Sequence, residues 1–363
     1  MPSDVVLTTT HTIISDFKKG DAEKYSCFDR VIIDEAHKLK NYATHGHMMI
    51  STIFHRTMYK LLLTGTPICN SINDLISLII LLNRSPYNDL EYWKGLSVSE
   101  KLDEITDIKK ELLLHRTKDT ILKETLPSIN ISSVKIPLGK KKVYRNIADM
   151  SFGCKLLKIL RMRQALNYVG LINLEELDLS HRTEINEKII QVREILDNVP
   201  TGDKVVVFSQ WACMLDILAL ANPESHLMYT GKVNMAEKTK VLEEFKTNPD
   251  IKVLYITLKC GGCGLNLNVA NHAIIVEPYF NIAEEKQAVD RIYRIGQEKQ
   301  VFVHKLSVSS SIESWMKQLQ NTKLSVSNMI LKNTGTSEDV MENMDKTSKM
   351  FQFFVDGIGE DME

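Results

Sequence analysis

The chain has 363 residues, enough for two domains, and its 44% hydrophobic and 25% charged residues are ordinary for a globular protein. A formal net charge of −1 excludes a protein that coats DNA through bulk charge, so nucleic-acid binding would need a local basic cleft. Scattered cysteines, the lack of a signal peptide and a longest apolar run ("LISLIILL") too short to span a bilayer predict an intracellular protein with no membrane segment.

Three short apolar runs near the start of the chain predict buried strands, at Asp4–Thr10, Arg30–Glu35 and Tyr59–Gly65. Helical patterns lie between them, and this alternation predicts a parallel sheet with helices on both faces. The next stretch, "SINDLISLIILLN", predicts a helix with Ser71 as N-cap and Asp74 as the acid of a capping box. Residues 1–84 are therefore expected to form one α/β domain.

The rest of the chain divides by its pattern. Residues 85–199 are helical and highly charged, with one strand-like run ("INISSVKIPL"), and are predicted to be a helical insert and linker. Strands and helices alternate again over 200–330 ("DKVVVFSQ", "SHLMYTG", "IKVLYITL", "NHAIIVEP" and "QVFVHKLSV" as strands), which predicts a second doubly wound parallel sheet. Residues 331–363 are acidic and weakly patterned and are expected to be a flexible tail.

Two adjacent carboxylates, Asp34 and Glu35, end the second predicted strand, where open parallel sheets bind ligands. One carboxylate can hold Mg²⁺, which prefers oxygen ligands, and the other could orient an attacking water. A solvated acidic pair is the alternative, but the apolar run before it favours the functional interpretation. Gly65 permits a tight turn that would place Thr64 and Thr66 on the same rim, although this motif alone also fits an ordinary strand-to-helix turn.

A glycine-rich stretch, "LKCGGCGLNL", lies in the second domain. Its glycines, Gly262 and Gly264 among them, would let backbone N–H groups approach a phosphate or a nucleic-acid strand; the alternative is a flexible loop. Cys260 and Cys263 form a CxxC, but no second pair with suitable spacing follows. Packing of small thiols is therefore favoured over a zinc site.

Arginines recur in "EEKQAVDRIYRIGQ". At helical spacing Gln287, Arg291 and Arg294 fall on one face, beside a stripe expected to be buried, formed by Ala288, Ile292 and Ile295. The planar, always charged guanidinium suits phosphate, and an arginine aimed at a γ-phosphate stabilises phosphoryl transfer. A salt-bridged surface helix is the alternative.

Taken in order, these motifs resemble those of the Swi/Snf-type DNA-dependent ATPases, a branch of the superfamily two helicases. "IIDEAHKLKN" is similar to motif II (the DEAH box), "LLLTGTPICNSINDLISLI" to motif III and "QAVDRIYRIGQ" to motif VI. "DVVLTTT", "KVVVFSQW" and "LKCGGCGLNL" resemble motifs Ib, IV and V, and "LLHRTK" resembles the segment that joins the lobes. The short layout also resembles the global transactivators of large DNA viruses.

The resemblance implies two RecA-like lobes, ATP and Mg²⁺ as cofactors, and duplex DNA as partner. It implies that Asp34 coordinates Mg²⁺, that Glu35 is the catalytic base, and that Arg291 and Arg294 reach the same triphosphate as arginine fingers. The remaining implied roles are nucleotide binding by Gln287, Gly262 and Gly264, coupling of hydrolysis to movement by Thr64, Gly65 and Thr66, and DNA binding by Thr9, Ser209 and Gln210. The implied activity is ATP-dependent translocation along DNA, in transcription or chromatin remodelling, in a nucleus or a viral factory.

One departure from the family is large. No G-x-x-x-x-G-K-[ST] phosphate-binding (Walker A) motif occurs in the chain. The first lobe is therefore expected to be incomplete, an N-terminal truncation that a protein or chain segment would complete, and ATP turnover by this chain alone is expected to be low. The alternative function is a catalytically impaired helicase remnant that binds DNA or protein.

Overall fold

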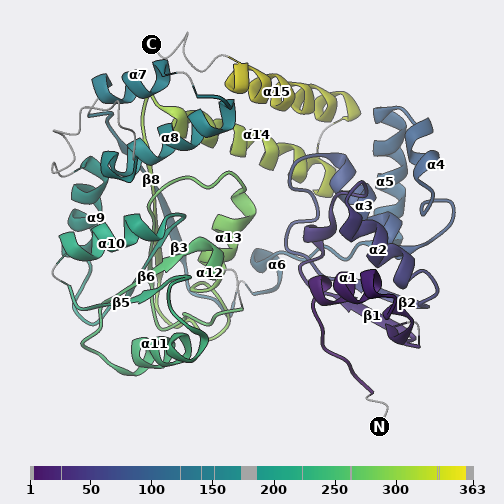
Figure 1. Ribbon diagram of the computed structural model, residues 1–363, viewed down its shortest axis with the longest axis horizontal. Helices are drawn as coiled ribbons and strands as arrows, with labels where there is room; N and C mark the ends of the chain where they lie inside the picture. Colours follow the sequence, from purple (N-terminus) through teal and green to yellow (C-terminus); the bar gives the residue numbers. More distant parts are fainter. Residues whose placement is uncertain are drawn as a thin grey trace. The chain divides into compact units, whose positions relative to one another are not determined.

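The computed structural model describes residues 4–356 except 26, 123, 140, 151, 173–185, 223, 262–263, 333 and 335. The chain forms two compact units (Figure 1): unit 1 comprises Met1–His115 and Thr322–Thr347, and unit 2 comprises Arg116–Asn321 and Ser348–Glu363. Among the described residues, no helix has the length and apolar character needed to cross a membrane.

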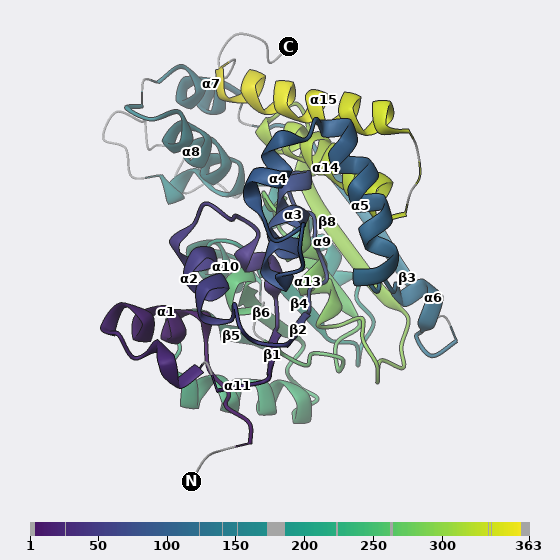
Figure 2. The same ribbon diagram turned by 90° about the vertical axis from the view of Figure 1, so that its right-hand side faces the viewer.

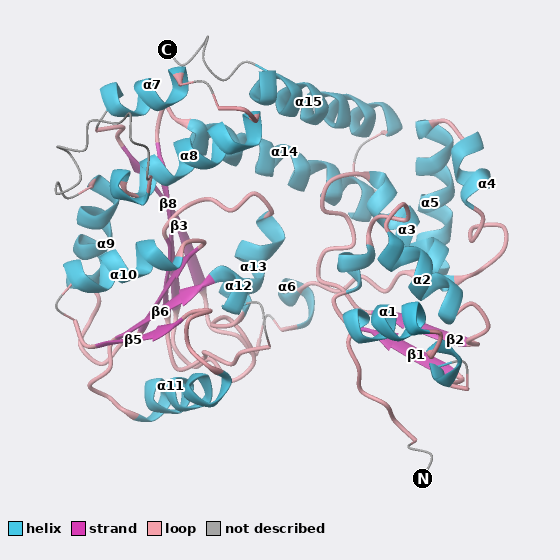
Figure 3. Cartoon of the chain, viewed as in Figure 1, coloured by secondary structure: helices cyan, strands magenta, loops and turns pink. Residues whose placement is uncertain are grey.

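The elements of unit 1 (Figure 3) are α1 (Thr10–Lys19), η1 (Ala22–Tyr25), β1 (Arg30–Ile33), η2 (Ala36–Leu39), α2 (His45–Ile53), β2 (Tyr59–Leu62), α3 (Ile72–Leu82), α4 (Leu90–Gly95) and α5 (Val98–Leu112). Those of unit 2 are α6 (Lys118–Ile121), β3 (Ile129–Ile136), α7 (Lys141–Asp149), α8 (Lys155–Asn167), η3 (Val169–Leu171), α9 (Glu187–Asp197), β4 (Val205–Ser209), α10 (Ala212–Ala221), β5 (His226–Tyr229), α11 (Met235–Thr247), β6 (Val253–Thr257), α12 (Leu258–Gly261), β7 (His272–Ile275), α13 (Ile282–Asp290) and β8 (Val301–Val308). Two helices, α14 (Ile312–Lys332) and α15 (Ser337–Asp356), contribute residues to both units.

The sheet of unit 1 is a parallel pair, β1 and β2, with Ile33 opposite Leu62. Successive side chains of a strand point to opposite faces. One face packs on a core formed with α1, α2 and α3. The other face is open: Ile32 is 57% exposed and Leu61, its partner across the pair, is 49% exposed. Within the described residues no third strand joins this pair.

The strand predicted at Asp4–Thr10 is wrong. Residues 4–9 pair with no strand, Val5 and Leu7 are 83% and 98% exposed, and Thr9 is instead the N-cap of α1. Its hydroxyl accepts a hydrogen bond from the Thr12 N–H at 3.1 Å. An apolar run becomes a strand only where a neighbouring strand can take its backbone groups, and the structure supplies none here.

The capping box predicted for α3 is confirmed. Asp74, 6% exposed, accepts hydrogen bonds from the backbone N–H groups of Asn70 and Ser71 at 2.6 and 3.4 Å. It thereby fixes the start of the helix that follows the second strand.

The prediction of a flexible tail over 331–363 is wrong for most of its described part. Ser337–Asp356 forms α15, and Val340 is 4% exposed in a cluster with Leu102 and Ile105 of α5 and Ile330 of α14. Acidic residues outnumber basic ones in this stretch, but its apolar residues recur at a helical spacing, and their stripe packs into the core of unit 1.

Unit 2 contains a six-stranded parallel sheet of order β3-β8-β7-β4-β6-β5. The parallel α/β architecture is therefore confirmed, and each strand lies in a run that the sequence predicts. Both faces are buried: Val205 and Val207 pack on one cluster of side chains, whereas Val206 and Phe208 pack on another. This explains the uninterrupted apolar runs.

Residues 85–199 are not a separate insert and linker. The helices α4 and α5 belong to unit 1, whereas β3 and α7–α9 belong to unit 2. The strand β3 lies beside β8 at the sheet edge (Figure 2). The helices α8 and α9 bury Met162, Val192 and Leu196 in a cluster with residues of the sheet. Their apolar stripes need the sheet as a partner, which makes them one of its covering layers.

Candidate nucleotide and nucleic-acid site

The two acids predicted to be catalytic lie where β1 ends. Asp34 is exposed, and its Oδ1 accepts a hydrogen bond from the Glu35 N–H at 2.8 Å. Glu35 has a left-handed backbone, with φ 50° and ψ 44°, which is uncommon for a residue other than glycine. The next residue, Ala36, donates its N–H to the Leu63 carbonyl at 2.9 Å and so ties this turn to the one after β2.

A histidine that the sequence analysis did not single out joins these two turns. His37 Nδ1 lies 3.3 Å from Glu35 Oε2 and 3.1 Å from Thr64 Oγ1. The Thr64 hydroxyl in turn accepts the Thr66 N–H at 3.1 Å. Burial lowers the pKa of His37, which favours a neutral imidazole. Acids and threonines thus share one rim, as predicted, and His37, three residues after Asp34, could have been found from that spacing.

The carboxylates on this rim suit a metal ion that takes most of its ligands from water and phosphate rather than from the protein. No group of three or more His, Cys, Asp or Glu side chains that could hold a metal ion occurs in the part of the chain that the structure describes. One exposed carboxylate, Asp34, fits Mg²⁺, which keeps several waters and commonly shares phosphate oxygens with one or two carboxylates. The assignment of Asp34 to a nucleotide-bound Mg²⁺ stays a prediction.

The arginines of unit 2 lie on a turn and not on a continuous helix. The helix α13 ends at Asp290, Arg291 is its C-cap, and Ile295 is 65% exposed where a buried residue was expected. Ala288 and Ile292 are buried as predicted. Residues 291–297, here called the arginine turn, close at Gly296, whose φ of +91° ordinary side chains rarely adopt.

The arginine turn is fastened to the loop 265–270. The Arg291 carbonyl accepts the Leu267 N–H at 2.9 Å, and Arg294 Nη1 donates to the Leu265 carbonyl at 3.1 Å. Gln297 Nε2 donates to the carbonyls of Asn268 and Ala270 at 3.1 and 2.8 Å. The "RIGQ" ending is thus an ordered turn, and Gln297 has a structural role in binding it to loop 265–270.

The glycine-rich stretch is described in part. Gly262 and Cys263 lie outside the described residues, so neither the predicted role of Gly262 nor the CxxC geometry can be compared with the structure. Gly264 has a φ of +56°, and a Cβ added there would meet nothing within 4 Å. The Cys260 side chain packs against the core of unit 2, which fits the packing interpretation.

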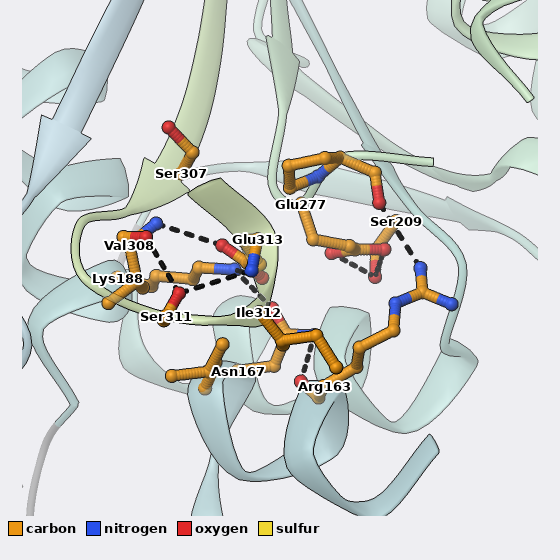
Figure 4. Close-up of polar contacts among 12 residues, drawn as sticks. Arg163, Asn167, Lys188, Ser209, Glu277, Ser307, Val308, Ser311, Ile312 and Glu313 are labelled. Carbon is orange, nitrogen blue, oxygen red and sulfur yellow. Dashed lines mark hydrogen bonds and ion pairs between the residues drawn. The ribbon is translucent and has the colours of Figure 1, made fainter. Parts of the chain in front are cut away.

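Ser209 and Gln210, predicted to contact DNA, lie at the carboxyl end of β4. Ser209 is fully buried, and its hydroxyl donates to both oxygens of Glu277 at 3.0 and 3.1 Å (Figure 4). The structure therefore argues against a DNA contact by this side chain. Gln210 is half-buried; its N–H donates to Glu277, and its Oε1 accepts from Arg163 Nη2 at 2.8 Å.

A buried network of charged residues lies around the carboxyl end of β4; its members are Arg163, Lys188, Glu277 and Glu313. Lys188, which is 0% exposed, contacts Glu313 at 2.5 Å and donates to Asn167 at 2.8 Å (Figure 4). Arg163 also donates to the Pro278 carbonyl at 3.1 Å. Burial raises the pKa of Glu277 to about 7, an effect that Lys188 and Arg163 oppose. Sequence reasoning missed the network because charged helical residues are normally exposed.

Comparison with known proteins places these features in a family. The SNF2-related domain matches residues 2–198, and the helicase conserved C-terminal domain matches residues 187–296. The "Probable global transactivator" of Orgyia pseudotsugata multicapsid polyhedrosis virus is 29% identical over 86% of this chain and 68% of its own length. The Mus musculus "Chromodomain-helicase-DNA-binding protein 6" is 29% identical over 90% of this chain, which spans only 13% of that protein.

A solved structure also aligns with the chain. The "Sulfolobus solfataricus SWI2/SNF2 ATPase core in complex with dsDNA" is 25% identical, and the alignment covers 96% of this chain and 77% of that chain with a TM-score of 0.46. The family model alone covers more than half of the present chain. The chain therefore belongs to the SNF2-related family, and it also carries a helicase conserved C-terminal domain.

Proposed function

We propose that this chain is the motor part of a DNA-dependent ATPase that couples ATP hydrolysis to movement along duplex DNA. The observation that carries the proposal is the rim of unit 1, where Asp34, Glu35, His37 and Thr64 meet around the ends of two parallel strands. A chain that only binds a partner needs neither the paired acids nor the left-handed Glu35 backbone, which costs about 1 kcal/mol or more. The arginine turn of unit 2 adds two guanidiniums.

In this proposal Glu35 accepts a proton from the attacking water, and Asp34 holds Mg²⁺ together with the nucleotide phosphates. Arg291 and Arg294 stabilise negative charge during phosphoryl transfer. Thr64, Gly65 and Thr66 couple hydrolysis to movement; Gln287, Gly262 and Gly264 contact nucleotide; Thr9 and Gln210 contact DNA. The activity would serve transcription or chromatin remodelling in a nucleus or a viral factory.

Phosphate release with and without duplex DNA tests the proposal. We expect DNA to stimulate turnover, and Glu35→Gln to abolish it, because the amide cannot accept the proton. The matched control is Glu91→Gln, an exposed acid of unit 1 that pairs only with Lys94 in the described contacts. Turnover that Glu35→Gln leaves unchanged would refute the site assignment.

A second candidate function rests on the missing G-x-x-x-x-G-K-[ST] motif. In that case the chain is a remnant that binds DNA or protein and hydrolyses nothing. Fluorescence anisotropy of a labelled duplex separates the two: binding at nanomolar to micromolar concentrations with no DNA-stimulated phosphate release favours the remnant, whereas both together favour the enzyme.

We also propose that a polypeptide carrying the phosphate-binding loop covers the open face of β1 and β2. Ile32, Tyr59 and Leu61 are 57%, 52% and 49% exposed on that face, and an uncovered apolar sheet face invites a partner. The probe is a polypeptide with a G-x-x-x-x-G-K-[ST] loop, taken from the part of the viral relative outside the alignment where that part carries the loop. Its addition is expected to raise turnover, and Leu61→Asp is expected to prevent this; an equal response in both proteins would refute the proposal.

A further inference from the structure

Lys118, a lysine with no individual role assigned so far, contacts the end of α13. Lys118 is the first residue of α6, within "LLHRTK". Its Nζ contacts Asp290 Oδ1 at 2.7 Å and donates to the Tyr293 carbonyl at 2.5 Å. It also lies 5.3 Å from the centre of the Tyr293 ring. One ammonium group thus contacts a carboxylate, a backbone carbonyl and an aromatic ring, all from the segment that carries the arginines.

The end of α13 is a place where nearby cations are favourable. A helix C-terminus carries partial negative charge, and an acid there is unfavourable. The last residue of α13 is Asp290, and the last turn of the helix contains no basic residue. In addition to Arg291 at the C-cap, Lys118 brings a positive charge to the helix end and to the Asp290 carboxylate.

The contact acts at the centre of the arginine turn, because Tyr293 lies between Arg291 and Arg294. The Tyr293 N–H donates to the Val289 carbonyl at 2.8 Å, and its carbonyl is held by Lys118. With both sides of this residue fixed, the Cα atoms of the two arginines have little freedom to move. Loop 265–270 fastens the turn from one side, and Lys118 fastens it from another.

We propose that Lys118 is a positioning residue: it holds the arginine turn through Asp290 and the Tyr293 carbonyl, and so sets the directions in which Arg291 and Arg294 point. This inference rests on the proposed function for its catalytic consequence. The contact itself does not depend on that function, and it can be tested separately.

Lys118→Met keeps the side-chain length and removes the charge and the donors. Hydrogen–deuterium exchange followed by mass spectrometry would report peptides over residues 288–298. Lys118 and Asp290 are about one third exposed, so losing their contact should destabilise the arginine turn only moderately. We expect amide exchange over residues 288–298 to accelerate about five-fold. Lys118→Arg should restore protection. The matched control is Lys232→Met, which breaks another 2.7 Å lysine–aspartate pair of unit 2 and should leave these peptides unchanged.

Exchange over 288–298 that stays unchanged in Lys118→Met overturns the proposal, as does an equal acceleration throughout unit 2. Where the unmodified chain hydrolyses ATP, Lys118→Met should lower kcat about ten-fold or more with little change in KM, because the arginines act on the transition state. An unchanged kcat would also overturn the positioning role. Absence of turnover in the unmodified chain counts against the proposed function only, and exchange then decides the contact.

Discussion

Removing the ammonium of Lys188 should destabilise unit 2 strongly. Lys188 and Glu313 are 0% and 1% exposed and lie 2.5 Å apart. In Lys188→Met the Glu313 carboxylate stays buried and keeps the Val308 N–H at 2.9 Å, while the Asn167 oxygen loses its donor. Breaking a buried pair from one side costs about 3–5 kcal/mol. Because about 1.4 kcal/mol corresponds to a factor of ten in an equilibrium constant, global opening should become at least ~100-fold more frequent.

Hydrogen exchange of the β4 and β7 amides measures this opening, since these central strands exchange only when the sheet of unit 2 opens. Lys232→Met is the matched control: its pair is 62% and 41% exposed, and its loss should cost under about 1 kcal/mol. The double variant Lys188→Met, Glu313→Leu should recover much of the loss, because no unpaired charge remains. If exchange of the β4 and β7 amides accelerates less than ~5-fold in Lys188→Met, then water reaches the Lys188–Glu313 pair or the network does not hold α9 on the sheet, and the prediction is refuted.

Three further changes give distinct outcomes. Burial raises the pKa of Glu277 to about 7 from 4.5, so the folded state binds the proton of this group more tightly than the unfolded chain does. This group therefore makes unit 2 less stable as pH rises from 4.5 through about 7. The free energy of unfolding in urea, measured at about pH 5 and about pH 8, should differ less between the two pH values in Glu277→Gln than in the unmodified chain. Gly296→Ala should accelerate exchange over 288–298, because φ is +91° and the new Cβ would lie 2.8 Å from Asn268 Nδ2; unchanged exchange would contradict this geometry. Val340→Asp should destabilise unit 1 by about 2–4 kcal/mol, measured by exchange of the α5 amides, whereas a loose tail would show no effect.

The parallel sheet of unit 2 could be predicted because its strands are buried on both faces. Successive residues of such a strand are therefore apolar, as in Val205–Ser209, and the run is visible in the sequence. The rim of unit 1 could be predicted for a similar reason: parallel neighbours end at the same edge, so the turn that carries Asp34 and the turn that carries Thr64 had to lie side by side. Both inferences use only local pattern and one rule of sheet geometry.

Other features depend on partners far away in the chain. Asp4–Thr10 has a strand pattern but no strand beside it. The periodicity of "QAVDRIYRIGQ" continues beyond Asp290, and only the contacts of Gln297 with loop 265–270 show that the chain has left the helix. Charged residues such as Lys188 indicated an exposed insert, although the partner that buries this lysine lies 125 positions away in the sequence.

The backbone of Glu35 has a consequence for how this chain could change over time. At a φ of 50° glycine removes the local backbone strain, and the substitution loses the partly exposed Glu35 carboxylate together with its contact to His37. A lineage that had abandoned chemistry would therefore gain stability by a substitution to glycine at this position. If Glu35 is the catalytic base, as proposed, deep mutational scanning should find that Glu35→Gly raises protein abundance but lowers ATP-dependent activity.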